Sequence, residues 1–131
     1  MGLNSSKRVK EDNIPFYNDI KYDSIMMQVI KTIDSTKFIG IIKDGWTTKK
    51  LLCRIYGYKL TDDANINITY AAFNSLINEC SGLFDAKIHG VDYNGLVLVT
   101  LNYLKKKKSV NYKMLLIDGV VQEKNHKMYG E

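Results

Sequence analysis

The chain has 131 residues, enough for one domain with a modest core and too few for two. Hydrophobic residues make up 45% and charged residues 25%, which is ordinary for a soluble globular protein and argues against wholesale disorder. The net charge of +5 comes almost wholly from lysine, because only Arg8 and Arg54 of the 19 basic residues are arginines. A diffuse lysine field suits weak attraction to nucleic acid or anionic lipid better than bidentate phosphate recognition.

The sequence contains neither a candidate membrane span nor a secretory signal, and its two cysteines follow no recognised site pattern. No apolar run approaches the roughly 20 residues of a membrane span, and the N-terminus lacks the apolar core of a secretory signal, so we expect an intracellular protein. Cys53 and Cys80 lack metal-ligand spacing and the density of a disulfide scaffold, so we expect reduced thiols and offer neither as a nucleophile. His89 and His126 are isolated and are assigned no role.

The N-terminal half is predicted to contain a tail and three strands. Residues 1–21 hold the only proline and no apolar periodicity, and are expected to form a flexible basic tail ahead of a domain at 22–131. Residues 24–33, 37–42 and 49–58 are rich in β-branched and apolar side chains, with Asp44-Gly45 supplying a turn. We expect these three segments to form a meander.

The second half is predicted to contain two helices and two strands. Apolar positions near helical spacing precede Cys80-Ser81-Gly82, which ends the segment; these positions are Ile68, Ala71, Ala72, Phe73, Leu76 and Ile77. Strands are expected at 83–91 and 96–104 around Asn94-Gly95, and a short helix at 109–117 with Ser109 as its N-cap. This order predicts a β-rich α+β fold: a five-stranded OB-type barrel with a helix inserted after the third strand and a second short helix.

Several phrases of the sequence resemble one known family. Residues 29–36 read Val-Ile-Lys-Thr-Ile-Asp-Ser-Thr, and residues 53–60 read Cys-Arg-Ile-Tyr-Gly-Tyr-Lys-Leu. Residues 90–99 read Gly-Val-Asp-Tyr-Asn-Gly-Leu-Val-Leu-Val, and Ser-Val-Asn at 109–111 precedes Leu-Ile-Asp-Gly-Val-Val at 116–121. Together they resemble the staphylococcal-nuclease (thermonuclease-like) family over residues 26–123, which implies a barrel of that class.

The resemblance implies phosphodiester hydrolysis in which two aspartates hold calcium, a glutamate acts on the attacking water and two arginines neutralise the phosphate. Asp34 stands at the first aspartate of the family's Asp-Gly-Asp phrase, whereas Thr36 and Lys59 stand at the two metal-binding aspartates. Asp62 stands at the glutamate, and the arginine positions are Arg54 and Leu96. An ammonium at Lys59 occupies the place of a divalent cation, so we expect calcium affinity to be largely lost.

Each remnant residue has an ordinary structural interpretation. Asp34 is interpreted as a turn residue, with a metal ligand as the alternative. Arg54 is either a partly buried arginine satisfied by backbone carbonyls or by Asp62, or a phosphate contact. A one-residue shift of the alignment would bring Asp62 or Asp63 to an aspartate position, which keeps residual nuclease activity open.

Two basic segments lie outside the family's catalytic positions. Met1-Gly2-Leu3-Asn4-Ser5-Ser6-Lys7 fits a myristoylation pattern at Gly2, with an ordinary tail as the alternative. Acylation implies a eukaryotic cell or its virus, and nearby basic residues would add a second membrane signal. A lysine run forms either a solvated loop or a phosphate or lipid contact; its members are Lys105, Lys106, Lys107 and Lys108.

Three functions are weighed on this basis. The leading hypothesis is a catalytically impaired thermonuclease-like domain that is tethered to a membrane by its tail and binds a partner; it rests on Thr36, Lys59 and Leu96. The alternatives are an active calcium-dependent nuclease acting on DNA or RNA, and a nucleic-acid-binding OB-fold protein that uses its lysines. No cofactor is expected, with calcium required only if the nuclease site is retained.

Overall fold

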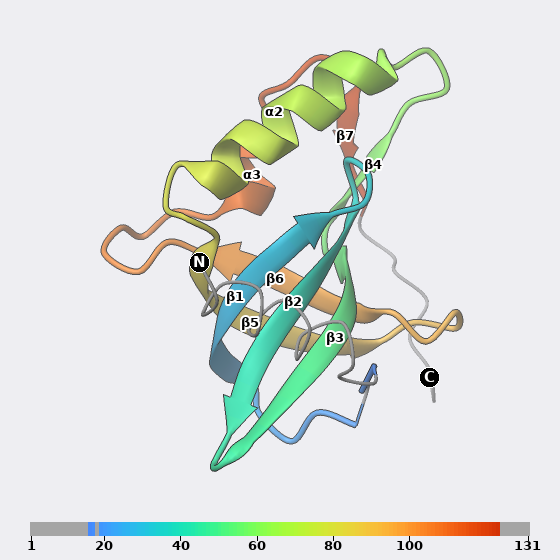
Figure 1. Cartoon of the computed structure of the whole chain (residues 1–131). Helices are drawn as coiled ribbons and strands as arrows, with labels where there is room; N and C mark the ends of the chain where they lie inside the picture. The colour runs from blue at the N-terminus through green and yellow to red at the C-terminus, as the bar shows by residue number, and fades with distance from the viewer. Residues whose placement is uncertain (1–15, 18, 124–131) are drawn as a thin grey trace, which may run out of the picture.

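The computed structural model describes residues 16, 17 and 19–123. Gly2, Pro15 and His126 lie outside these residues. Figure 1 shows the described elements, which in chain order are β1 (Ser24–Thr32), β2 (Lys37–Asp44), β3 (Thr47–Ile55), β4 (Tyr58–Leu60), α2 (Ile66–Asn78), β5 (Leu83–Val91), β6 (Val97–Asn102), α3 (Val110–Met114) and β7 (Val120–Gln122).

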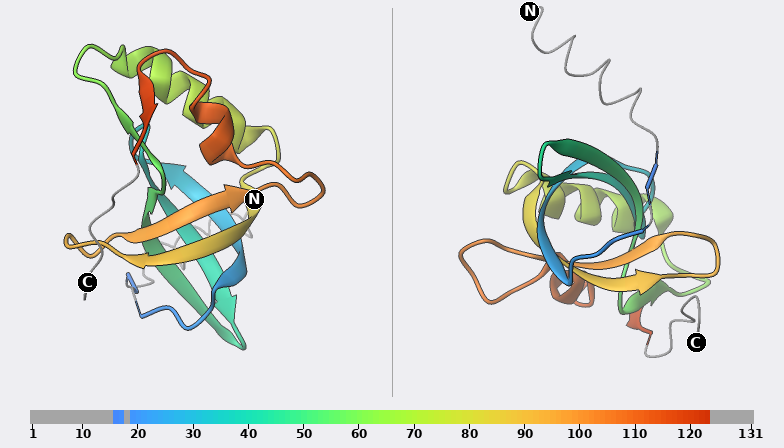
Figure 2. Two further views of the ribbon diagram at one scale, coloured as in Figure 1. Left: turned by 180° about the vertical axis from the view of Figure 1, so that it is seen from behind. Right: turned by 90° about the horizontal axis from the view of Figure 1, so that it is seen from below.

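Five strands close into a barrel in the order β1, β2, β3, β6, β5. The right view of Figure 2 looks along this barrel. Four neighbouring pairs are antiparallel, whereas β3 and β6 run parallel from Cys53 opposite Val97 to Ile55 opposite Val99. The predicted β-rich α+β fold with a five-stranded OB-type barrel is therefore confirmed.

The barrel core follows the two-residue period of its strands. On β3, Leu51, Cys53 and Ile55 are fully buried, whereas the residues between them are only partly covered. Because successive side chains of a strand point to opposite faces, this alternation sends one set inside and the other outside. Arg54 therefore lies on the outer face of the barrel.

The expected strand over 49–58 is wrong in its boundaries. β3 begins at Thr47 and ends at Ile55, and the chain then bends at Gly57, which has a φ of +95°. This left-handed conformation is accessible to glycine and interrupts the strand. The next three residues form β4, which pairs with β7 in a separate two-stranded sheet. The first helix accordingly follows β4 rather than the third strand, and β7 is an element that the sequence pattern did not predict.

α2 lies across one end of the barrel (Figure 1). It begins at Ile66, two residues before the first apolar position used to predict it, because the Asn65 side chain accepts a hydrogen bond from the Ile68 amide at 3.1 Å. Its buried side chains are Thr69, Phe73 and Ile77, and the ring of Phe73 lies 6.3 Å from that of Phe38 on β2. This contact closes the apolar interior at that end.

α3 is shorter than the helix expected over 109–117. Ser109 is its N-cap, as predicted, with its hydroxyl oxygen accepting from the Tyr112 amide at 3.0 Å. The helix ends at Met114, and turns then lead to β7. This short helix packs beside β6 and buries three side chains, those of Val110, Asn111 and Met114.

Candidate functional site

The turn between β1 and β2 contains Asp34 and Thr36. One carboxylate oxygen of Asp34, Oδ1, accepts three hydrogen bonds: from the Thr36 amide at 2.8 Å, the Thr36 hydroxyl at 2.9 Å and the Lys37 amide at 2.9 Å. Its other oxygen lies 3.7 Å from the Lys37 ammonium. A short acidic side chain that binds the backbone two and three residues ahead stabilises a turn.

This turn is held against the chain where β3 ends and β4 begins. The Ile55 amide donates to the Thr36 carbonyl at 2.8 Å, and the Tyr58 hydroxyl donates to the Ser35 carbonyl at 2.5 Å. Tyr58 is fully buried, and burial, with a smaller contribution from the charge of Asp34, raises the pKa of its phenol above the ordinary value. Two of the segments that carry the resemblance, residues 29–36 and 53–60, are thus in direct contact.

Arg54 makes its ion pair with a residue that the sequence did not single out. Its Nη2 lies 3.7 Å from Oε2 of Glu123, and each side chain is about one quarter exposed, at 28% and 26%. Glu123 is placed there by β7, and its amide donates to the Gly57 carbonyl at 2.9 Å. Sequence reasoning offered Asp62 as an acidic partner and missed Glu123 because β7 itself was not predicted.

The other residues that the resemblance singled out lie on different parts of the chain. Lys59 is exposed on β4 opposite Val121, and Asp62 is exposed in the turn that follows. Its neighbour Asp63 accepts from the Thr61 hydroxyl at 2.6 Å. Leu96, where the resemblance implies an arginine, is 7% exposed, and its amide donates to Asp92 Oδ1 at 2.9 Å. The structure therefore brings Asp34, Thr36 and Tyr58 together and leaves Asp62 in solvent.

The donor set does not fit calcium. This ion takes six to eight oxygen ligands, usually including several carboxylates. Asp34 Oδ1 already accepts three local hydrogen bonds, and the Thr36 hydroxyl is one of their donors. Among residues 16, 17 and 19–123, no group of three or more His, Cys, Asp or Glu side chains is arranged to hold a metal ion.

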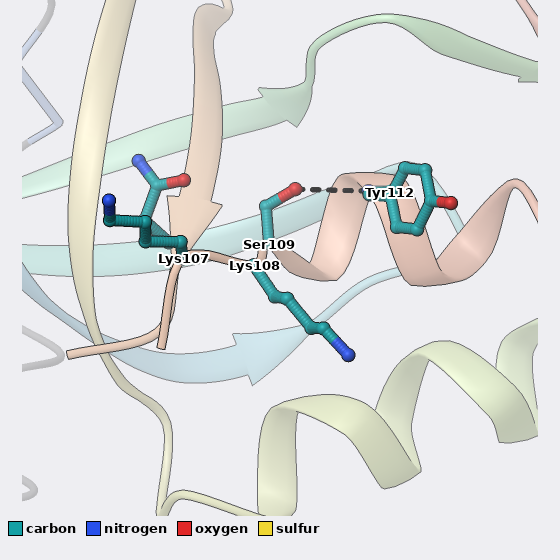
Figure 3. A pocket seen from close by; sticks show the side chains of 5 residues that line it. Lys107, Lys108, Ser109 and Tyr112 are labelled. Carbon is teal, nitrogen blue, oxygen red and sulfur yellow. Dashed lines mark hydrogen bonds between the residues drawn. The ribbon is translucent and has the colours of Figure 1, made fainter. Parts of the chain in front are cut away.

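The lysine run lies in the loop between β6 and α3. A small open pocket beside it is lined by Asn102, Lys107, Lys108, Ser109 and Tyr112. Figure 3 shows Lys107 and Lys108 extending to opposite sides, so their ammonium groups do not converge on one anion in this arrangement. No carboxylate lines this pocket, so the charge of its lining residues is positive.

Cys53 and His89 are chemically reactive residue types, and both are held by contacts within the fold. Cys53 is a free, fully buried thiol in the barrel core, and burial raises its pKa, which suppresses the reactive thiolate. His89 stacks on Tyr56, with ring centroids 3.8 Å apart, and its Nε2 lies 2.7 Å from the Thr100 hydroxyl oxygen.

In the described part of the chain, no helix combines the length and apolarity needed to span a bilayer.

No protein-family model matches the chain, and no curated protein matches it. The assignment that stands on the structure is the fold: a five-stranded mixed β-barrel with a helix, consistent with an OB-type fold.

Proposed function

We propose that this protein is a thermonuclease-like barrel with little or no nuclease chemistry, which serves as a binding module tethered to a membrane through its N-terminal tail. The main support for the proposal is the set of hydrogen bonds that the Asp34 carboxylate accepts. Its Oδ1 is engaged by two backbone amides and one hydroxyl of its own turn, so the carboxylate acts as a turn stabiliser.

The residues at the other positions implied by the resemblance support the same proposal. Lys59 places an ammonium at a position where the resemblance implies a metal-binding carboxylate, and Leu96 places a buried aliphatic side chain where it implies an arginine. Arg54 faces Glu123. An arginine that neutralises a phosphate must present its guanidinium to the ligand, and a carboxylate beside it competes for that role.

The tail contributes the membrane part of the proposal. Gly2 and the basic residues that follow it fit an acylated, positively charged anchor, in which one acyl chain and a basic cluster act together. A barrel carried on such an anchor would present its outer surface to partners at the membrane.

The test is a cleavage assay on the purified full-length chain with single- and double-stranded DNA, in calcium and separately in manganese. We expect no cleavage above that of the Arg54→Ala variant. Lys31→Ala, which removes an exposed charge on β1, is the matched control. Cleavage that needs the metal, stops with a chelator, persists in Lys31→Ala and disappears in Arg54→Ala would establish an active nuclease and overturn the proposal.

A further inference from the structure

Trp46 is the only tryptophan of the chain, and it lies at the tip of the β2–β3 hairpin. Its exposure, 105% of the reference value, means that nothing in the described structure packs against its indole. The strands pair up to Asp44 opposite Thr47, leaving Gly45 and Trp46 as a two-residue turn. Figure 1 shows this hairpin projecting beyond the rest of the barrel.

The segment before β1 contacts the hairpin close to its tip. Asp44 accepts from the Lys49 ammonium at 2.7 Å and from the Tyr22 hydroxyl at 2.5 Å. Lys49 also lies over the ring of Tyr17, 4.0 Å from its centroid, and the Tyr17 amide donates to the Lys50 carbonyl at 2.8 Å. These contacts tie the segment before β1 to the hairpin and hold Trp46 in a protruding position.

The tip of the β2–β3 hairpin carries a net positive charge. Residues 41–50 contain three lysines and one aspartate, Asp44, whose charge is already paired with Lys49. Lys43 is exposed near the tip, and Lys21 is exposed and close enough to Asp44 to help lower the pKa of that carboxyl, after the larger effects of Lys49 and Tyr22. An exposed indole flanked by lysines matches the interface of an anionic bilayer, where tryptophan rings and basic side chains concentrate.

The N-terminal tail joins the folded domain beside the same hairpin. The first described residue, Phe16, forms a bridge with Lys50 of β3, and the Lys50 ammonium lies 4.5 Å from the centroid of its ring. The fifteen preceding residues, which include Gly2 and the basic cluster, are therefore connected to the domain at this end. The hairpin therefore lies at the end of the domain to which an anchor in that tail would be attached.

We propose that the tip of the β2–β3 hairpin docks on anionic lipid bilayers, with the Trp46 indole in the headgroup region and Lys43 and Lys21 against the headgroups. The proposal rests on the membrane tether of the proposed function. A bilayer is favoured over single-stranded nucleic acid because binding of a strand uses a basic groove with successive aromatic platforms, whereas Trp46 stands alone on a projecting turn.

The intrinsic fluorescence of Trp46 reports this docking directly. The full-length chain, acylated by co-expression with an N-myristoyltransferase and also unmodified, is mixed with phosphatidylcholine vesicles with and without phosphatidylserine. We expect a blue shift of the emission with the anionic vesicles, because the indole leaves water. Emission that stays at its aqueous wavelength while the acylated protein sediments with vesicles would overturn the hairpin proposal and leave the tether standing.

Variants separate the contributions of the hairpin and the tail. Trp46→Ala should weaken co-sedimentation of the acylated chain by about tenfold, the effect of one buried aromatic side chain. Tyr93→Ala, which removes an exposed aromatic residue from the β5–β6 turn, is the matched control and should bind normally. Lys43→Glu keeps the fluorescent probe and should reduce the blue shift. Equal binding by Trp46→Ala and Tyr93→Ala would contradict the proposal.

The two proposals can fail separately. If Gly2→Ala sediments as well as the co-expressed wild-type chain, the acyl tether is absent, and a blue shift of Trp46 in the same samples still supports docking by the hairpin. Quenching of Trp46 by an oligonucleotide, with no shift in any vesicle, would assign the tip to nucleic acid and overturn membrane docking.

Discussion

At the scale of single residues, Asn111 joins α3 to two parts of the barrel region. Its side-chain oxygen accepts from the Leu101 amide at 3.0 Å, and its side-chain nitrogen donates to the carbonyls of Tyr56 at 2.7 Å and Val99 at 3.1 Å. The residue is 8% exposed, so water cannot easily replace these bonds. Asn111 therefore satisfies backbone groups where the chain leaves β3 and where α3 packs on β6.

Replacing Asn111 by alanine should lower the free energy of unfolding by about 2–3 kcal/mol, because it leaves buried backbone groups without partners. Equilibrium urea unfolding followed by far-ultraviolet circular dichroism measures the loss. Asn67→Ala removes an exposed amide from α2 and should cost no more than about 0.5 kcal/mol. A similar loss in both variants would mean that the Asn111 bonds contribute little.

At the scale of elements, the β4–β7 sheet returns the chain to the bend between β3 and β4, which places Glu123 beside Arg54. Gly119 leads into β7 with a φ of +87°, and its carbonyl accepts from the Thr61 amide at 2.9 Å. A Cβ at this position would lie 2.7 Å from the Ala64 Cβ and 3.0 Å from the Ala64 Cα. Position 119 therefore requires glycine for both its conformation and its space.

Gly119→Ala and Gly45→Ala form a matched pair for this element. Gly45 also has a positive φ, +63°, but no atom lies within 4 Å of a Cβ placed there. Gly45→Ala should therefore cost only the conformational strain, about 1–2 kcal/mol. Gly119→Ala should cost about 1–3 kcal/mol more, because the added carbon displaces the Ala64 backbone. Urea unfolding compares the two, and equal losses would show that the chain at Ala64 moves freely.

At the scale of the whole molecule, burial of ionisable groups in the barrel and beside it affects the response to alkali. Burial raises the pKa of Tyr58 and of Cys53, and raises that of Tyr103 to about 12. In the unfolded chain these groups lose their protons at lower pH than in the folded protein. Above their ordinary pKa values the unfolded state therefore binds fewer protons, so stability should fall as the pH rises.

The Tyr58 share of this effect can be isolated. Tyr58 is fully buried and its unfolded phenol titrates near 10.0, so above that pH it should contribute a fall of about 1.4 kcal/mol per pH unit in the free energy of unfolding. Tyr58→Phe should lose some stability at neutral pH and show a shallower alkaline slope, whereas exposed Tyr93→Phe should keep the wild-type slope. Urea unfolding at a series of pH values measures both, and identical slopes would refute this account.

The candidate site was only partly accessible from the sequence. The resemblance to the thermonuclease-like family singled out Asp34 and Arg54, because each belongs to a short phrase of neighbouring residues that could be compared directly. The Arg54 partner, Glu123, was not found, because β7 is three residues long and has no periodic pattern to reveal it. The contact between Tyr58 and Ser35 was also hidden, since it joins residues 23 positions apart across a strand break.

Apolar periodicity, turn residues and caps determined the number of barrel strands, the main helix and the Ser109 cap, because these depend on interactions between near neighbours. Only the tertiary structure decided that the barrel closes through the parallel β3–β6 pair and that Asp34 Oδ1 is engaged by its own turn. It also decided which end of the barrel carries the projecting Trp46 and receives the chain at Phe16. These features depend on distant segments meeting in space, which local pattern does not encode.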